Sequence, residues 1–236
     1  MRPIVLYLAL LGALGCTSNP DAFASMAEQR PIQIADRGDR NDDAMRRLNE
    51  RDGLLDPALE GDDIKRGIPI TVDLAGAGPG SIIGYRARKH AGLIDLRRLR
   101  HYAPSDYWHV LRASETRSLV LDPGEFYILA SKEAVRVPAD HAAEMLAYDT
   151  AMGEFRVHYA GFFDPGFGHA DAGGEGTRAV LEVRSHEVPF VLEDGQRVGR
   201  LVYERLIARP DRLYGAGIGS SYQRQGLALS KHFRLD

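Results

Sequence analysis

The chain has 236 residues, of which 44% are hydrophobic and 27% charged, the usage of an ordinary globular protein. Its 30 basic and 33 acidic residues leave a formal net charge of −3, so the basic excess typical of nucleic-acid-binding proteins is missing. The single cysteine, Cys16, can form neither a disulfide framework nor a Cys-based zinc site. This excludes the zinc-dependent nucleobase deaminases, which need an H-x-E element and a P-C-x-x-C element.

The first 25 residues differ from the rest of the chain. Residues 4–15 (IVLYLALLGALG) are almost wholly apolar, yet too few to span a bilayer, which takes about 20 residues. They fit the apolar region of a secretory signal. The sequence Leu14-Gly15-Cys16 also resembles a bacterial lipoprotein box, in which Cys16 carries the lipid. The other interpretation is a chance apolar start on a cytoplasmic protein.

Residues 26–67 are predicted to form a charged arm and a linker. The interspersed acidic and basic residues are typical of a solvated helix face. A short helix with Met45 and Leu48 facing inward is expected, ending at Gly53. Residues 54–67 are expected to link this arm to the rest of the chain.

Residues 68–236 predict one mainly β domain, a sandwich or barrel, because short β-type runs recur between turn sequences. The turns are D-P-G at 122–124 and 164–166 and E-D-G at 193–195. Residues 138–147 favour a helix by propensity. The expected strands are residues 68–74, 82–88, 119–121, 126–130, 134–137, 155–159, 178–185, 190–192 and 201–205.

Glu182 is the most informative polar residue, because it interrupts an apolar strand. Alternation places Leu181 and Val183 on one face and Glu182 on the other. Glu182 is either solvent-facing and paired with Arg178 or Arg184, or held at a site, where burial would raise its pKa and suit a general base. The eight histidines are scattered without metal-binding spacing, so no metal site is predicted.

Three further segments carry a resemblance to a known family. They are YAGFFDPGFG followed by RAVLEV, then EVPFVLEDGQRVGRLVYERL, and then YGAGIGSSYQRQGLALSKHF. In this order they resemble the dCTP deaminases of the dUTPase-like superfamily, and most of all the longer bacterial enzymes with two such domains in tandem. The likeness runs from about residue 68 to the end of the chain.

The resemblance implies a dUTPase-like β-barrel or β-clip, usually assembled as a homotrimer. It implies hydrolytic deamination of dCTP to dUTP in the cytoplasm without zinc, with Glu182 as the general base that activates water. No protein-bound cofactor is expected, and Mg²⁺ would arrive with the triphosphate.

The resemblance also implies which residues bind the nucleotide. Main-chain groups of Ala160 and Gly161 would hold the cytosine and the water, and Asp164 would lie beside the deoxyribose. Three residues of the C-terminal part would close over the nucleotide: Tyr214, Tyr222 and Gln225.

The sequence departs from the family pattern where the phosphates should bind. The family's Gly-Arg-Ser-Ser stretch should come just before Gly153, where residues 147–152 read AYDTAM, and Ser221 replaces a usual lysine. Residues 168–176 form an insertion. We expect the missing motif to come from the first domain of the tandem enzymes, so that the chain alone is a weak or inactive deaminase.

Three other functions stay open at the level of sequence. A dUTPase-type pyrophosphatase would use Asp164 as its base. A non-catalytic remnant would bind a nucleotide without converting it. An exported lipoprotein would carry a β-sandwich domain anchored through Cys16.

Overall fold

The computed structural model describes residues 42–59, 63–147, 155–157, 161–185, 188–215 and 226–234. Residues 1–25, with Cys16, lie outside the described part. Within that part the chain is mainly β, as predicted. Its elements in chain order are α3 (Asp42–Asp52), β1 (Leu55–Asp56), β2 (Ile68–Thr71), β3 (Ile82–Ala87), α4 (Pro104–Tyr107), β4 (Trp108–Arg112), β5 (Ser118–Leu121), β6 (Tyr127–Val135), β7 (His141–Ala147), β8 (Phe155–Val157), β9 (Phe162–Phe163), the 3-10 helix η5 (Ala170–Ala172), β10 (Thr177–Ser185), β11 (Phe190–Glu193) and β12 (Arg197–Arg205).

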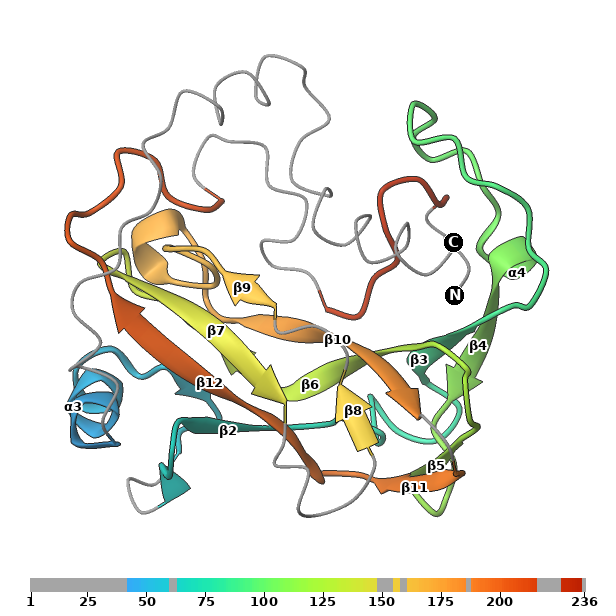
Figure 1. Cartoon of the computed structure of the whole chain (residues 1–236), viewed down its shortest axis with the longest axis horizontal. Helices are drawn as coiled ribbons and strands as arrows, with labels where there is room; N and C mark the ends of the chain where they lie inside the picture. The colour runs from blue at the N-terminus through green and yellow to red at the C-terminus, as the bar shows by residue number, and fades with distance from the viewer. Residues whose placement is uncertain are drawn as a thin grey trace.

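Over the described residues, the strands pair into three sheets, and every pairing is antiparallel. The largest has the order β4-β3-β6-β10-β8, with β1 also on β6; the second has the order β2-β12-β7-β9; the third pairs β11 with β5. Figure 1 shows β6 and β10 crossing the middle of the molecule, with α3 beside β12 and β7 at one end and β3 and β4 at the other. This arrangement makes β10 an interior strand, paired along both edges.

The main core collects the inward side chains of both larger sheets and of α3. Met45 and Leu48 of α3 are buried in it, as predicted. The helix ends at Asp52, and the amide of Gly53, which has φ +57°, donates to the carbonyl of Asn49 at 2.8 Å. Glycine is favoured there because a left-handed residue closes the last turn.

Residues 138–147 do not form the helix that their propensity favours. His141–Ala147 is strand β7, which pairs with β12 on one edge and β9 on the other. His141, Ala143 and Met145 are buried, so this short segment shows the period of two of a half-buried strand. The prediction was wrong because pairing on two edges outweighs a weak local helix propensity.

The segment 54–67 is not a free linker either. Leu54, Leu55 and Ile64 are buried in the main core, and β1 pairs with β6 through Leu55 and Val135. These apolar residues are spaced too irregularly to indicate an element by periodicity. Contacts with residues distant in the sequence therefore bring this segment into the core.

A second apolar cluster covers the outer face of the largest sheet. Trp108, Phe126 and Phe233 are buried in it, with ring centroids 6.2 Å apart for both Trp108–Phe126 and Trp108–Phe233. The C-terminal segment 226–234 reaches this cluster, and the amide of Arg234 donates to the carbonyl of Tyr102 at 2.9 Å. The cluster thus fixes the end of the described chain to the sheet that contains β10.

The insertion 168–176 is a closed loop. The amide of Gly176 donates to the carbonyl of Gly168 at 2.8 Å, and η5 lies between these two glycines. Gly168 has φ +63°, and a Cβ there would overlap the carbonyl oxygen of Val135. The loop joins the turn at 164–166 directly to the start of β10.

We expect Gly168→Ala to lower the free energy of unfolding by more than about 1 kcal/mol beyond the effect of Gly173→Ala. Gly173 has a similar φ of +74° but open space around a Cβ, so the pair separates the steric overlap from the backbone strain. Urea denaturation followed by the fluorescence of Trp108, the only tryptophan, measures both variants. Equal destabilisation would show that the Val135 carbonyl does not constrain the loop.

Candidate functional site

Glu182 lies on the outer face of β10, as its alternation predicts. It stands directly opposite Ile128 of β6, while Leu181 and Val183 are buried on the other face. Its own side chain is partly buried. In the described part of the chain, no hydrogen bond or ion pair to the Glu182 carboxylate is present. The side chain is thus desolvated, and no described residue compensates it.

Burial without a partner raises the pKa of Glu182 from 4.5 to about 7. Desolvation disfavours the charged form of a carboxylic acid, and no cation among the described residues opposes it. Near neutral pH the group is therefore partly protonated and partly ionised. It can accept a proton and return it, which is the property of a general acid–base residue.

The two arginines that share the face of Glu182 are both engaged elsewhere. Arg178 donates to the buried Asp73 at 2.6 Å. The guanidinium of Arg184 lies 5.7 Å from the centre of the Phe126 ring, a cation–π geometry. The sequence left open whether Glu182 is neutralised by one of these arginines, and these contacts answer that it is not.

Asp73 links β10 to the glycine-rich loop 74–80. Its Oδ1 accepts from the amides of Ala75 at 3.1 Å and Gly76 at 2.8 Å, while Oδ2 accepts from Arg178. The carboxylate is therefore saturated by protein donors. The GAGPG sequence is an anchored turn next to β10, and the sequence offered no signal that Asp73 and Arg178, 105 positions apart, would meet.

The turn that contains Asp164 packs against Tyr214. The amide of Tyr214 donates to the carbonyl of Pro165 at 2.8 Å, and the rings of Phe167 and Tyr214 lie 5.5 Å apart. Gly166 fits here with φ +94°, because a Cβ would come within 2.9 Å of Leu213. The structure thus brings Asp164 and Tyr214 into one neighbourhood, although the Tyr214 side chain is buried.

Asp164 is itself partly buried, and burial raises the pKa of its carboxyl. Its turn follows β9 in the second sheet, whereas Glu182 belongs to the largest sheet. No hydrogen bond or ion pair between described residues joins the two carboxyls. Their placement in one cleft stays a prediction.

Gly161 lies just before β9, and its carbonyl accepts from the amide of Met145 at 3.0 Å. Ala160, Tyr222 and Gln225 lie outside the described residues, so their assignment stays a prediction. Ile128, the cross-strand neighbour of Glu182, was not singled out from the sequence. The apolar run 126–130 contained the signal, but the pairing register was needed to place Ile128 opposite Glu182.

No group of three or more His, Cys, Asp and Glu side chains is arranged to hold a metal ion within the described part of the chain. None of the helices found there has both the length and the apolar character needed to cross a membrane.

The raised pKa of Glu182 predicts a pH-dependent stability. The folded pKa of about 7 exceeds the ordinary value of 4.5, so stability is fully present below about pH 4.5 and is lost as pH rises through 7. The free energy of unfolding of Glu182→Gln should therefore rise relative to that of the wild type over this range, by up to about 3 kcal/mol. Urea denaturation at a series of pH values measures this. The same pH dependence of the free energy of unfolding in both proteins would contradict the prediction. Glu115→Gln, at an exposed residue, is the control.

Residues 41–233 match the family described as 2′-deoxycytidine 5′-triphosphate deaminase (DCD), C-terminal domain. A dCTP deaminase of Haloarcula marismortui is 29% identical over 188 residues, which cover 78% of this chain and 88% of that protein. A dCTP deaminase, dUMP-forming, of Halobacterium salinarum is 36% identical over 121 residues, or 50% of this chain and 57% of that protein.

The crystal structure of 2′-deoxycytidine 5′-triphosphate deaminase from Agrobacterium tumefaciens superimposes with a TM-score of 0.64 and 46% sequence identity, which confirms the dUTPase-like fold class. The match covers 77% of this chain and 50% of that one. The chain thus spans about half the length of this protein and of the Halobacterium relative. With four-fifths of its length inside the family match, the chain belongs to the family of the dCTP deaminase C-terminal domain.

Proposed function

We propose that the protein deaminates dCTP to dUTP and ammonia, with Glu182 as the general base. The observation that carries this proposal is a partly buried carboxyl on β10 with a pKa of about 7 and no bonding partner in the described chain. Glu182 is the glutamate of the L-E-V strand, to which the resemblance to dCTP deaminases assigns the base. The names of the relatives support the substrate.

The reaction needs one proton to move twice. Water adds to C4 of cytosine while Glu182 accepts a proton from it, so that a C–O bond forms and the carboxylate becomes neutral. The proton then passes to the amino nitrogen, the C4–N bond breaks, and ammonia leaves. The proton of the new C4 hydroxyl moves to N3, which gives the C4=O and N3–H of uracil. One water is consumed, and Glu182 returns to its ionised form. A pKa near 7 serves both steps, because neither protonation state is strongly disfavoured.

The surroundings of Glu182 support this role. Ile128 stands opposite the carboxyl on β6, and Tyr85 of β3 stands opposite Ile128 in the same row. Ile128 and Tyr85 limit the access of water to the Glu182 carboxyl, which keeps its pKa raised. They also offer the cytosine an apolar surface and an aromatic ring. Glu182 therefore needs no neighbouring titratable group to function near neutral pH.

The phosphates need donors beyond this face of β10. Arg178 is held by Asp73, and Arg184 packs against Phe126, so this face offers at most one arginine to a triphosphate. We propose that the donors come from another subunit of a homotrimer or from the first domain of a tandem enzyme. Mg²⁺ would enter with the nucleotide. The proposed nucleotide-binding residues remain Ala160, Gly161, Asp164, Tyr214, Tyr222 and Gln225.

A second candidate product is dUMP, because several relatives are named dUMP-forming. This activity would use a second water to release pyrophosphate from dUTP. Asp164, whose pKa is raised by burial, is the candidate base for that step. Chromatography of the products distinguishes the two reactions. dUTP as the sole product supports deamination alone. Formation of dUMP by the wild type but not by Asp164→Asn supports the bifunctional reaction.

We propose a cytoplasmic location, where the nucleotide is available. The alternative is a membrane-anchored lipoprotein, lipidated at Cys16. Cell fractionation decides between them, since an acylated protein in the membrane fraction would contradict a role in nucleotide metabolism.

Glu182→Gln should lower the rate of ammonia release from dCTP by about 10²–10⁴-fold, because the amide cannot accept the proton. A coupled ammonia assay on the chain supplemented with the N-terminal half of the Agrobacterium tumefaciens relative measures it, with Glu115→Gln as the matched control that should keep the wild-type rate. Binding of dCTP should persist in Glu182→Gln. An unchanged rate in this variant would remove Glu182 from the mechanism.

The 236-residue chain alone should turn over dCTP well below about 1 s⁻¹, an ordinary enzymic rate. Addition of the N-terminal half of the Agrobacterium tumefaciens relative, in trans or by fusion, should raise the rate by supplying phosphate donors. Full activity of the chain alone would contradict this. A folded fusion that binds dCTP without releasing ammonia would instead indicate a nucleotide-binding remnant.

A further inference from the structure

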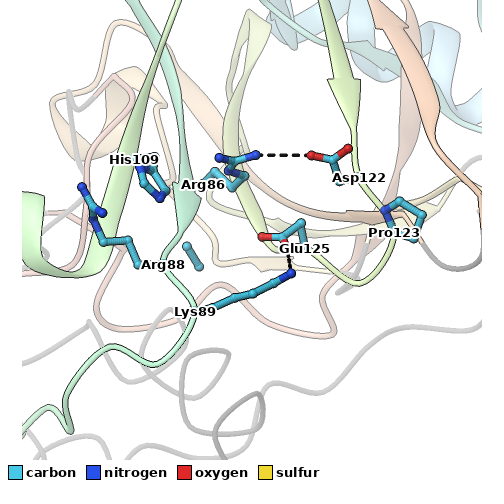
Figure 2. A pocket seen from close by; sticks show the side chains of 8 residues that line it. Arg86, Arg88, Lys89, His109, Asp122, Pro123 and Glu125 are labelled. Atoms are coloured by element: carbon cyan, nitrogen blue, oxygen red, sulfur yellow. Dashed lines mark hydrogen bonds and ion pairs between the residues drawn. The ribbon is translucent and has the colours of Figure 1, made fainter.

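A pocket of about 510 Å³ opens where β3 ends beside β4 and the turn between β5 and β6 (Figure 2). Its volume falls within the range of small-molecule sites. It is lined by Arg86, Ala87, Arg88, Lys89, His109, Asp122, Pro123 and Glu125. None of these residues has a role in the proposed deamination.

The pocket is separate from the face that carries Glu182. Tyr85 lies in register with Ile128, which pairs with Glu182, so these three side chains share one face of the sheet. Arg86 pairs with His109 in the next row. Since neighbouring residues of a strand point to opposite faces, Arg86 and His109 point away from the Glu182 face.

Cationic groups outnumber carboxylates in the pocket. Arg86 pairs with Asp122 at 3.3 Å, and Lys89 pairs with Glu125 at 2.6 Å. For the Arg88 side chain no partner exists among the described residues, and it is exposed. The Nε of Arg86 is buried without a hydrogen bond. One positive charge and one buried donor therefore have no partner among the described residues.

His109 lies between Arg86 and Arg88 (Figure 2). Burial and the two guanidinium groups lower the pKa of His109, while Glu125 acts weakly in the opposite direction. The imidazole is therefore neutral at pH 7 and presents one N–H donor. An anion placed among these three side chains would reverse the effect and raise the pKa of His109.

We propose that this pocket binds a phosphate group, held by Arg86, Arg88 and His109. Arg86 stands opposite His109 on β3 and β4, and Arg88 follows Arg86 by two residues and so lies on the same face. Figure 2 shows His109 between the two guanidinium groups. A phosphate offers oxygens in several directions, and a guanidinium can bind two of them. A carboxylate has two oxygens in one plane and would satisfy only part of this set.

The ion pair of Arg86 does not block such a ligand. The side chains of Arg86 and Asp122 are 35% and 52% exposed, and surface ion pairs of this kind contribute little to stability. Arg86 can therefore exchange the Asp122 carboxylate for a phosphate oxygen at small cost. The Lys89–Glu125 ion pair also lines the pocket and need not break for the phosphate to bind.

The test is a titration of the full chain with inorganic phosphate, followed by the NMR signals of the histidine side chains, with His109→Gln assigning the His109 signal. Phosphate should raise the pKa of His109 and leave distant histidines such as His141 unchanged. Arg88→Gln should weaken binding about tenfold or more, because a charge-assisted contact is lost. Arg117→Gln, another exposed arginine outside the pocket, is the matched control.

A parallel titration with dCMP shows whether free phosphate or a nucleotide binds more tightly. Binding of either probe that is weaker in Arg88→Gln than in the wild type supports the proposal. The absence of any His109 response up to about 10 mM of both probes would overturn it. Equal binding by the wild type and Arg88→Gln would also overturn it, because the phosphate would then lie elsewhere. The readout does not depend on deaminase activity, so it is independent of the proposed reaction.

Discussion

The register between β10 and β6 is the constraint on which the candidate site depends. The pair Glu182–Ile128 fixes the alternation, so that Leu181 and Val183 enter the core and Glu182 faces outward. A slip by one residue would exchange the two faces and place the carboxyl in the core. The loss of buried apolar side chains opposes that slip, and the same contacts hold Glu182 in position.

Two connections reinforce this register from outside the sheet. At the start of β10, Arg178 reaches Asp73 and joins the strand to the glycine-rich loop 74–80. At its end, the carbonyl of Ser185 accepts from the amide of Gly124 at 3.0 Å. The second contact also links β10 to the turn between β5 and β6, which lines the proposed phosphate pocket. The strand is therefore held at both ends, while the carboxyl between them has no partner among the described residues.

The sequence predicted the parts of the fold in which local chemistry and burial agree. The strands that alternate between turn sequences were found, and so was α3, because Met45 and Leu48 lie on one face before a glycine. The segment 138–147 was misassigned because its residues favour a helix in isolation, and only β12 and β9 make it a strand. Strand β4 (Trp108–Arg112) was not among the expected strands.

For the site, the sequence could place Glu182 on an outward face but could not tell whether a cation neutralises it. Both nearby arginines had the right spacing for that role. Their actual partners, Asp73 and Phe126, are set by tertiary packing, which no local pattern reports. The raised pKa of Glu182 follows from the absence of such a partner in the described residues. The chemistry of the site thus depends on contacts made far along the chain.

The most direct test of the account is a crystal structure of Glu182→Gln with dCTP bound, determined in the presence of the N-terminal half of the Agrobacterium tumefaciens relative. The account predicts the cytosine against the face of β10 that carries Ile128, with a water molecule between C4 and the side chain at position 182. Cytosine bound on another face, with position 182 out of reach of C4, would contradict it.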